Sequence, residues 1–415
     1  MPKQPDPSGP LKGIRVIDFT AYQNGPMSTR LLADYGATVI KIEPNDGLGD
    51  PGRGAFGRPD GWSPLHNAFN HGKRSLQIDL KHPEAKQIVE KLAAWCDVVV
   101  ENFKEGVMDN FGIGYEQLRK VNPGLIYCWN SGFGPRGEWS GRASFDMIGQ
   151  AFSGALVCQG GGPTKGTPTQ VLASNVCDQI GGIMGSHAIL GALVHKLRTG
   201  EGQRVDTSQL GAMVALQQQG IILAAHDGKV QDDGNAPGFG RHDQQIYQCG
   251  DGKWMSIGWP TQKFWEIGLK ALDRPDLVCP EPQRVKNRRA LRRTLGEHLL
   301  TQPRAHWLGK LVDAAVPCAP AHSYLDVLEE PQLWANGYLV RLADDTVAVG
   351  PSATMSASPP QVQGPVPEPG AHSAEVLRQV VGLTESQIAS LVESGVVGLG
   401  APGAAQRQGR LPSKL

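Results

Sequence analysis

LKGIRVIDF at residues 11–19 and LADYGATVIKIEP at residues 32–44 decide the fold of this chain. The short apolar run Ile14–Phe19 predicts a buried strand, and Thr38–Ile42 predicts a second one. Between them, Met27–Tyr35 has the pattern of a helix and is followed by a glycine suited to end it. A strand, a helix and a strand in this order indicate a parallel pair of strands joined by a helical crossover.

The same alternation continues along the next ninety residues. Further strands are expected at Ser75–Leu80, Asp97–Val100 and Leu125–Trp129. Helices are expected from Pro83 onward, where apolar residues recur at helical spacing, and over Tyr115–Val121. This repeated unit predicts an α/β fold with a doubly wound, Rossmann-like parallel sheet.

The pattern changes after about residue 225. Two short strands, Gln245–Cys249 and Trp254–Ile257, flank a Gly-Asp-Gly hairpin signal. Helical stretches follow near residues 262–272, 288–300 and 305–314, and a last helical region covers 373–394. The chain is therefore expected to divide into residues 1–225 (large domain), 226–325 (small α+β domain), 326–397 (large domain) and 398–415 (disordered tail).

Composition excludes several classes of protein. Forty Lys and Arg residues balance forty Asp and Glu residues, so nothing indicates a nucleic-acid or membrane partner. The seven cysteines are odd in number and include no CxxC pair, which favours a reducing cytoplasm over a disulfide framework or zinc site. The histidines lack metal-binding spacing, so no metal is expected. The longest apolar run, Ile180–Val194, is broken by glycines and is expected to be a buried helix.

Residues 132–137 contain the glycine spacing of a dinucleotide-binding motif but lack the helix that such a site needs. Gly132–Gly137 matches GxGxxG after a strand, but Pro135 and the polar run Glu138–Arg142 stand where a dinucleotide-binding helix would begin. No GxSxG motif indicates a serine hydrolase. A plain turn is the preferred interpretation.

Several sequence blocks carry a resemblance to a known family. They are residues 11–19, Gly25-Pro26, residues 32–44, Lys73-Arg74-Ser75, Asp79-Leu80-Lys81, residues 100–103, Ser144-Phe145-Asp146, residues 200–206, residues 316–320 and residues 383–388. In number and order, these blocks resemble the class III CoA-transferases of the CaiB/BaiF type over about residues 11–396.

The resemblance implies a fold, an activity and an assembly. Members of that family build the large domain from both chain ends, insert the small domain between them, and interlock two chains in a homodimer. The implied enzyme moves coenzyme A from an acyl-CoA, such as succinyl-CoA, to an acceptor carboxylate. CoA thioesters are then substrates, and no cofactor is bound permanently. Some members instead work as heteromers with a related subunit.

The resemblance also implies a nucleophile, Asp146. An ionised carboxylate can attack a thioester and later leave, through an anhydride and an aspartyl-CoA thioester. Considered alone, an aspartate between Phe145 and Met147 could simply cap a helix. Gln23, at the end of the first strand, matches a glutamine that contacts the reacting acyl group in formyl-CoA transferase; an ordinary polar turn residue is the alternative.

Other residues match positions that contact CoA in the family. They are Lys81, Asn102 and Phe103, with Lys73 and Arg74 as further sources of positive charge. Gly238 and Gly240 could offer N–H donors to an oxyanion, although an ordinary turn is as good an interpretation. A basic residue of formyl-CoA transferase is replaced here by Asn110.

Two rival functions stay open at this point. An α-methylacyl-CoA racemase needs a histidine paired with the aspartate, and no histidine lies between His82 and Asp146. A non-catalytic subunit would not need to retain Asp146. The transferase is therefore preferred, and the sequence does not name its acids.

Overall fold

The computed structural model describes residues 8–55, 62–159, 167–171, 175–228 and 244–400. By its internal contacts the chain divides into two compact units, a large one of residues 1–237 with 334–415 and a small one of residues 238–333. The predicted tail from residue 401 onward lies outside the described residues, whereas Gly398 belongs to a strand.

A seven-stranded sheet forms the centre of the large unit. In spatial order its strands are β12 (Val397–Gly398), β3 (Arg74–Ile78), β2 (Thr38–Glu43), β1 (Arg15–Asp18), β4 (Val98–Glu101), β5 (Ile126–Ser131) and β6 (Arg204–Ser208). All neighbours pair in parallel except β12, which runs antiparallel to β3. Because β12 comes from the end of the chain, both chain ends build this sheet, and the predicted α/β fold is confirmed.

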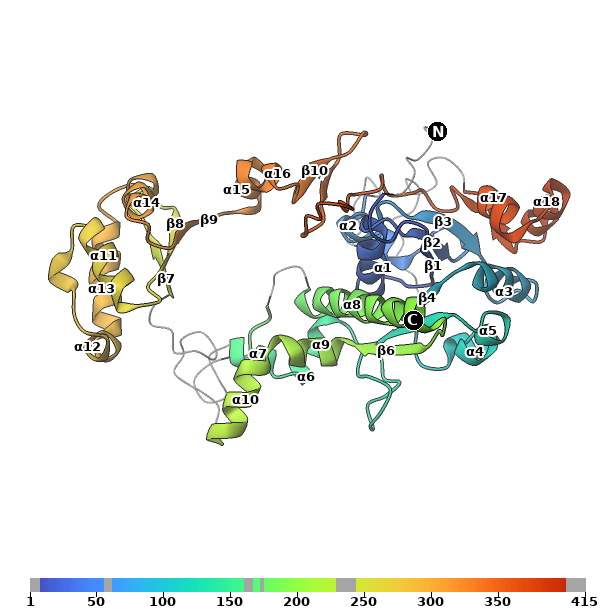
Figure 1. Ribbon diagram of the computed structural model, residues 1–415, viewed down its shortest axis with the longest axis horizontal. Coiled ribbons are helices and arrows are strands. Elements are labelled where there is room, and N and C mark those ends of the chain that lie inside the picture. Colours follow the sequence, from blue (N-terminus) through green and yellow to red (C-terminus); the bar gives the residue numbers. More distant parts are fainter. Residues whose placement is uncertain (1–7, 56–61, 160–166, 172–174, 229–243, 401–415) are drawn as a thin grey trace. The chain divides into compact units, whose positions relative to one another are not determined.

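Helices cover both faces of the sheet (Figure 1). On one face, α3 (Ala85–Trp95), α5 (Tyr115–Val121), α17 (Ser373–Val376), the π-helical turn Leu377–Val381 and α18 (Glu385–Glu393) contribute to one apolar core. On the other face, α1 (Asn24–Asp34) and α8 (Val176–Thr199) contribute to a second. Strand β1 serves both cores, since Val16 belongs to the second and Ile17 to the first, as alternation along a strand requires.

Glycine in α8 allows that helix to lie close against α1. A Cβ on Gly182 would stand 2.6 Å from the backbone oxygen of Asn24, and one on Gly185 would stand 2.8 Å from Asn130 Oδ1. By length and composition α8 is apolar enough to cross a membrane, but it packs against α1, β5 and β6. The sequence predicted a buried helix, but α8 is only partly buried, since Ile183, Val194 and Leu197 are exposed.

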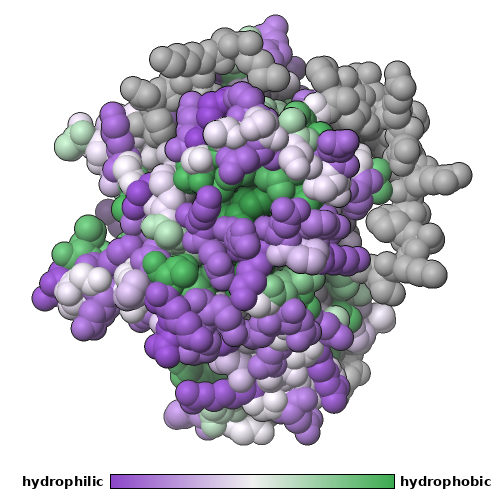
Figure 2. Space-filling view, turned by 90° about the vertical axis from the view of Figure 1, so that its right-hand side faces the viewer, coloured by the Kyte–Doolittle hydropathy of each residue, from purple (hydrophilic) through white to green (hydrophobic). Residues whose placement is uncertain are grey.

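Shorter elements complete the large unit. They are η1 (Pro51–Gly54), α2 (Pro64–Asn70), α4 (Val107–Asn110), α6 (Asp146–Phe152), α7 (Ala155–Gln159), α9 (Gln209–Leu216), α10 (Gln218–Asp227) and the hairpin of β10 (Leu339–Arg341) with β11 (Val347–Val349). The face of the large unit that carries α3 and α18 is mostly hydrophilic, with apolar side chains gathered near its centre (Figure 2).

The small unit is an α+β structure with its own core. An antiparallel sheet joins β7 (Gln244–Gln248), β8 (Trp254–Gly258) and β9 (Cys318–Ala321). The helices are α11 (Gln262–Ala271), α12 (Glu281–Lys286), α13 (Arg288–Leu299), α14 (Arg304–Asp313) and α15 (Tyr324–Glu329), with η2 (Pro275–Leu277); α16 (Pro331–Ala335) follows at the boundary. Trp259, Trp265 and Trp307 are buried in this core.

Candidate active site

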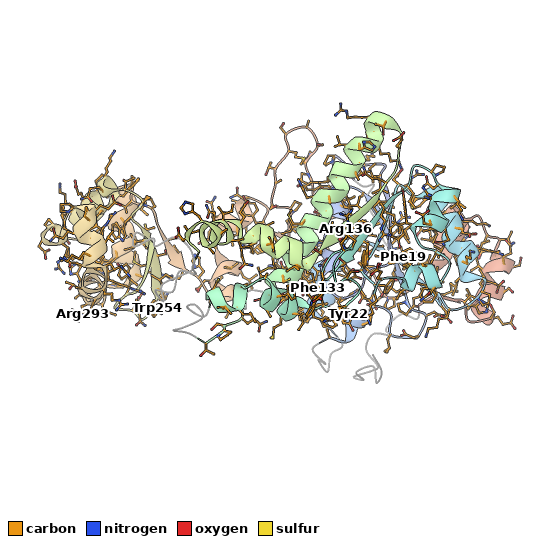
Figure 3. All side chains as sticks on the ribbon, turned by 90° about the horizontal axis from the view of Figure 1, so that it is seen from below. Phe19, Tyr22, Phe133, Arg136, Trp254 and Arg293 are labelled. Atoms are coloured by element: carbon orange, nitrogen blue, oxygen red, sulfur yellow. The ribbon has the colours of Figure 1, made fainter. Side chains whose placement is uncertain are left out.

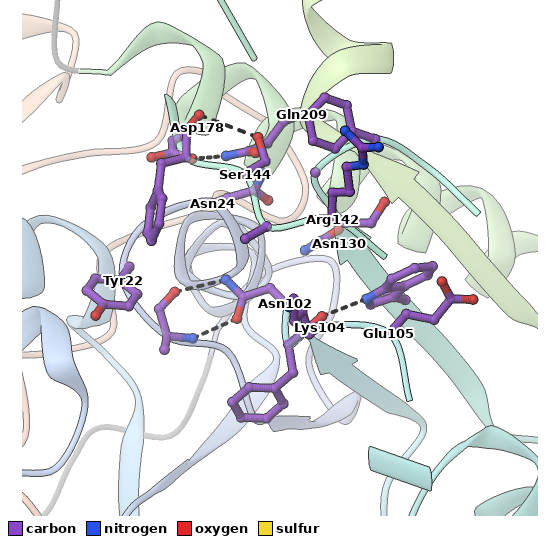
Figure 4. Close-up of a pocket in the computed structure, with 18 of the residues that line it drawn as sticks. Tyr22, Asn24, Asn102, Lys104, Glu105, Asn130, Arg142, Ser144, Asp178 and Gln209 are labelled. Carbon is purple, nitrogen blue, oxygen red and sulfur yellow. Dashed lines mark hydrogen bonds between the residues drawn. The ribbon is translucent and has the colours of Figure 1, made fainter. Parts of the chain in front are cut away.

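A cavity of about 380 Å³ opens beyond the carboxyl ends of β1, β4 and β5 (Figure 4). Its lining includes Ala21–Asn24, Asn102–Glu105, Trp129–Phe133, Gly141–Phe145, Asp178 and Gln209. Ligands of open parallel sheets bind at this end of the strands, where loops bring side chains from several strands together. The cavity is therefore the candidate active site.

The turn between β1 and α1 is held rigidly at the cavity. Asn102 accepts a hydrogen bond from the Ala21 backbone N–H and donates one to the Ala21 carbonyl, both at 2.9 Å. The Tyr22 N–H donates to Asp50 Oδ1 at 3.2 Å, and Tyr22 adopts a left-handed backbone with φ of 64°. The Asn102 amide thus fixes this turn through backbone contacts, and the residue also lines the cavity.

Gln23 lies in the cavity wall and is linked to the start of α8. Its side chain is buried, and its Oε1 accepts a hydrogen bond from Asn175 Nδ2 at 2.7 Å. Asn175 precedes α8 in a left-handed conformation, with φ of 59°. The contact joins the turn after β1 to the first turn of α8.

Asp146, the nucleophile predicted from the sequence, begins α6 and is buried beneath the start of α8. Its Oδ1 accepts from the Cys177 N–H at 2.7 Å and from the Asp178 N–H at 3.3 Å. Its Oδ2 accepts from Gln150 Nε2 at 2.6 Å. Asp146 is absent from the lining of the cavity, and its carboxylate satisfies the otherwise unpaired N–H groups of the α8 terminus.

Asp178 is the carboxylate that lines the cavity near Gln23, and the sequence interpretation missed it. It stands in the first turn of α8, where the helix dipole favours negative charge, and Gln209 Nε2 donates to its Oδ1. Burial, with the neighbouring charge of Asp146 as the second cause, raises the pKa of Asp178 to about 7. An acid in the first turn of a glycine-rich helix was the available signal.

A second cavity, of about 480 Å³, adjoins the first. Lys81 lines it, and Ala21, Pro51 and Phe103 line both cavities. The Phe103 N–H donates to Glu101 Oε2 at 2.8 Å, and burial raises the pKa of Glu101 to about 8. The structure thus brings Lys81, Asn102 and Phe103 to one continuous surface.

Lys73 and Arg74 lie elsewhere. Lys73 is fully buried, and its ammonium donates to Asp18 Oδ2, Asn70 Oδ1 and the Pro26 carbonyl. Those three bonds use all of its donors, so none remains for a phosphate. Arg74 pairs with Glu375 at 3.3 Å and lines neither cavity.

Three further predictions concern the loop with Gly238 and Gly240, metal binding, and the glycine-rich segment 132–137. Gly238 and Gly240 lie outside the described residues. Within the described ranges, no group of three or more His, Cys, Asp or Glu side chains could hold a metal ion. The glycine-rich segment 132–137 follows β5 without a helix beginning inside it, and Gly132 and Phe133 line the cavity.

Comparison with known proteins decides the family. Residues 11–373 match CoA-transferase family III. The chain belongs to this family. It is 34% identical over 402 residues to succinyl-CoA:mesaconate CoA-transferase of Haloarcula hispanica, covering 92% of this chain and 99% of that protein. It is 32% identical over 404 residues to mouse succinyl-CoA:glutarate CoA-transferase, covering 94% and 91%.

A solved structure agrees with the fold of this family III CoA-transferase. A CaiB/BaiF family protein from Brucella suis superposes with a TM-score of 0.80 at 28% identity, over 90% of this chain and all of that one. The family resemblance and the predicted CoA-transferase class of enzyme are confirmed. The CoA-transferases to which the chain is similar use CoA thioesters as substrates.

Proposed function

We propose that this CoA-transferase moves coenzyme A from succinyl-CoA to a small dicarboxylic acid, through a covalent intermediate on an active-site aspartate. The observation that carries the proposal is a half-buried carboxylate, Asp178, in the wall of the cavity at the first turn of α8. The relatives named above act on succinyl-CoA with mesaconate or glutarate, which are dicarboxylic acids.

Two aspartates are candidates for the nucleophile. Asp146 is the sequence prediction, and Asp178 is the residue that lines the cavity. Hydrogen bonds from three donors occupy both oxygens of Asp146, so an attack would break the cap of α8. We therefore favour Asp178 as the nucleophile and give Asp146 the role of positioning it through the backbone of residues 177 and 178.

The reaction then proceeds in four balanced steps. The Asp178 carboxylate attacks the thioester carbonyl, the C–S bond breaks, and a mixed anhydride and CoA thiolate result. The thiolate attacks the aspartyl carbonyl, giving an aspartyl-CoA thioester and free succinate. The acceptor carboxylate attacks that thioester, giving a second anhydride and the thiolate again. Finally the thiolate attacks the acceptor carbonyl, which yields the new acyl-CoA and restores the Asp178 carboxylate.

The two adjoining cavities provide room for the parts of CoA. Lys81 in the second cavity offers an ammonium to the phosphates, and its apolar lining, which includes Ile78, Leu80 and Phe111, suits the adenine. Phe103 lies where the two cavities meet, so the pantetheine arm would pass it on the way to Asp178. Gln23 lines the same cavity, and we propose that it contacts the reacting acyl group there.

The assembly and location are part of the same proposal. Helix α10 carries Ile221, Ile222 and Leu223, yet none of its residues is buried, so we propose that a second copy of the chain covers it. The cysteine pattern of the sequence favours the cytoplasm.

Trapping the intermediate tests the function and the nucleophile together. Purified protein is mixed briefly with succinyl-CoA and then with hydroxylamine, which converts an activated carboxylate into a hydroxamate detected by intact mass. Peptide mapping is expected to locate it at Asp178, and Asp178→Asn is expected to abolish it. Asp146→Asn keeps an acceptor oxygen for the Cys177 N–H and is expected to retain the adduct.

The other outcomes are equally informative. A hydroxamate at Asp146 would restore the sequence prediction and overturn our choice of Asp178. No adduct with succinyl-CoA or other acyl-CoAs would overturn covalent transfer. Exchange of the α-proton in deuterated water would then identify a racemase, and no exchange would identify an inactive subunit.

A further inference from the structure

The cavity wall contains two cations, Lys104 and Arg142, whose roles the proposed function leaves open. Within the described ranges, Arg142 makes no ion pair within 4.0 Å, although Glu105 lines the same cavity. Glu105 Oε2 instead accepts a hydrogen bond from Ser140 Oγ at 3.0 Å. Arg142 is exposed to solvent where it lines the cavity, so its guanidinium is accessible to an anion.

Arg142 is held in place by an aromatic cluster. Its guanidinium carbon lies 4.0 Å from the centre of the Trp139 ring. Trp139 packs against Phe133 and Phe152, with ring centres 5.2 Å and 4.8 Å away. Stacking uses the face of a guanidinium and leaves the N–H groups on its edge free to bind a carboxylate with two parallel hydrogen bonds.

The loop beneath Arg142 is also fixed. The Arg142 N–H donates to the Trp139 carbonyl at 3.2 Å, and Gly141 adopts a left-handed backbone with φ of 70°. The bond from Ser140 to Glu105 ties this loop to the segment that follows β4. Arg142 is therefore positioned before substrate arrives, which lowers the entropy lost on binding.

We propose that Arg142 binds the remote carboxylate of dicarboxylic substrates, both as the acyl group of the donor and as the acceptor acid. The inference rests on the proposed function, because the reacting carboxylate is the one presented to Asp178. In Figure 4, Ser144 and Gln209 lie between Asp178 and Arg142, which leaves the two charged groups on separate parts of the cavity wall. A monocarboxylic acid would leave the guanidinium without a partner, so the site selects for two carboxylates.

The charge of Arg142 is the feature to test. Binding of glutarate and of pentanoate, two acids of equal chain length, is measured by calorimetry with the full-length protein, in the presence of CoA. Arg142→Gln is expected to weaken glutarate binding about 10- to 100-fold, the range of a charge-assisted hydrogen bond of about 1.5–3 kcal/mol. Pentanoate binding is expected to stay the same. The glutarate affinity of Arg142→Lys is expected to lie between those of the wild type and Arg142→Gln. An ammonium keeps the positive charge but cannot form the two parallel hydrogen bonds of a guanidinium.

Matched controls separate this role from general charge effects. Arg136→Gln changes an exposed arginine between β5 and α6 that does not line the cavity, and it is expected to leave both acids unaffected (Figure 3). Lys104→Gln removes the other cation in the wall. If Lys104→Gln, and not Arg142→Gln, weakens glutarate binding, the assignment to Arg142 is overturned.

The experiment also separates carboxylate binding by Arg142 from phosphate binding, and the carboxylate site from the proposed transferase activity. A loss of CoA affinity in Arg142→Gln with an unchanged preference for glutarate would mean that Arg142 binds phosphate, and would overturn the proposal. Equal binding of the two acids by the wild-type protein would overturn it as well. Because binding needs no turnover, a wild-type protein that prefers glutarate but transfers no CoA would contradict the proposed function and leave the carboxylate site standing.

Discussion

At the scale of single residues, the proposed chemistry depends on the charge of Asp178. Its pKa is raised to about 7 by burial and by the charge of Asp146, so only about half of the molecules carry the ionised nucleophile at neutral pH. We expect kcat/KM for succinyl-CoA to rise with pH and to level off above about pH 8. Initial rates between pH 5.5 and 9 measure this, and Asp146→Asn should move the acidic limb to lower pH. An acidic limb below pH 5 would contradict the assignment.

The raised pKa of Asp178 also predicts that the folded protein becomes less stable as pH rises. The folded protein holds this proton more tightly than the unfolded chain does, so the free energy of unfolding falls as pH rises from about 4 to about 7. Asp178→Asn removes a half-buried charge, and we expect it to raise Tm by a few degrees at pH 8. The gain should narrow toward pH 5. Thermal unfolding of both proteins at pH 8 and pH 5 measures this difference in Tm. A Tm of Asp178→Asn below that of the wild type at pH 8 would contradict the prediction.

Sequence alone could identify part of this site. Gln23, Asn102 and Phe103 follow predicted strands, and the structure brings them to one cavity because parallel strands end at a common edge. Asp178 could not be placed in this way. It reaches the cavity only because α8 begins beside Gln23, a contact between residues 152 positions apart in sequence, made by Asn175. Lys73 was predicted to add positive charge at the CoA site, whereas long-range packing buries it against Asp18.

At the scale of elements, the approach of α8 to α1 sets the position of the active site. Gly182→Ala would place a methyl group 2.6 Å from both the Asn24 carbonyl oxygen and Met27 Cβ, so the two helices must separate. We expect lower Tm and reduced kcat, because the first turn of α8 carries Asp178. The matched control is Gly191→Ala in the same helix, where the added methyl meets nothing within 4 Å.

That control should be neutral or stabilising, by up to about 1 kcal/mol, because alanine favours the helix. Tm and kcat of the two variants, measured side by side, test the argument. If Gly182→Ala retained wild-type Tm and kcat, the helices would not need this close approach.

Periodic elements were predictable, and elements defined by tertiary pairing were not. The strand expected over Thr38–Ile42 is β2, Thr38–Glu43, and the helix over Tyr115–Val121 is α5 with the same bounds. Strand β12 has two residues, and only its pairing with β3 makes it a strand. The helix expected over 373–381 changes to a π-helical turn at Leu377–Val381, which apolar spacing does not reveal.

At the scale of the whole molecule, the two chain ends meet in one sheet. The sequence interpretation placed the domain division near residues 225 and 325, and the compact units divide at 237 and 333. The β12–β3 pairing requires a contact between residues more than 300 positions apart, and only the family resemblance implied it. Hydrophobic patterning describes each strand but does not determine which strand lies beside it.

Exposed apolar side chains on α9 and α10 predict that the chain forms a dimer. Ile222 on α10 has 66% of its surface exposed, and Leu216 at the end of α9 has 54%. Burying such side chains contributes roughly 1.5–3 kcal/mol each, which favours association. We expect light scattering after size exclusion to give the mass of a dimer, and Ile222→Glu to shift it toward a monomer. Val121→Glu, which changes a 43% exposed side chain at the end of α5, should stay dimeric. A monomeric wild-type chain would indicate that a different subunit covers α10.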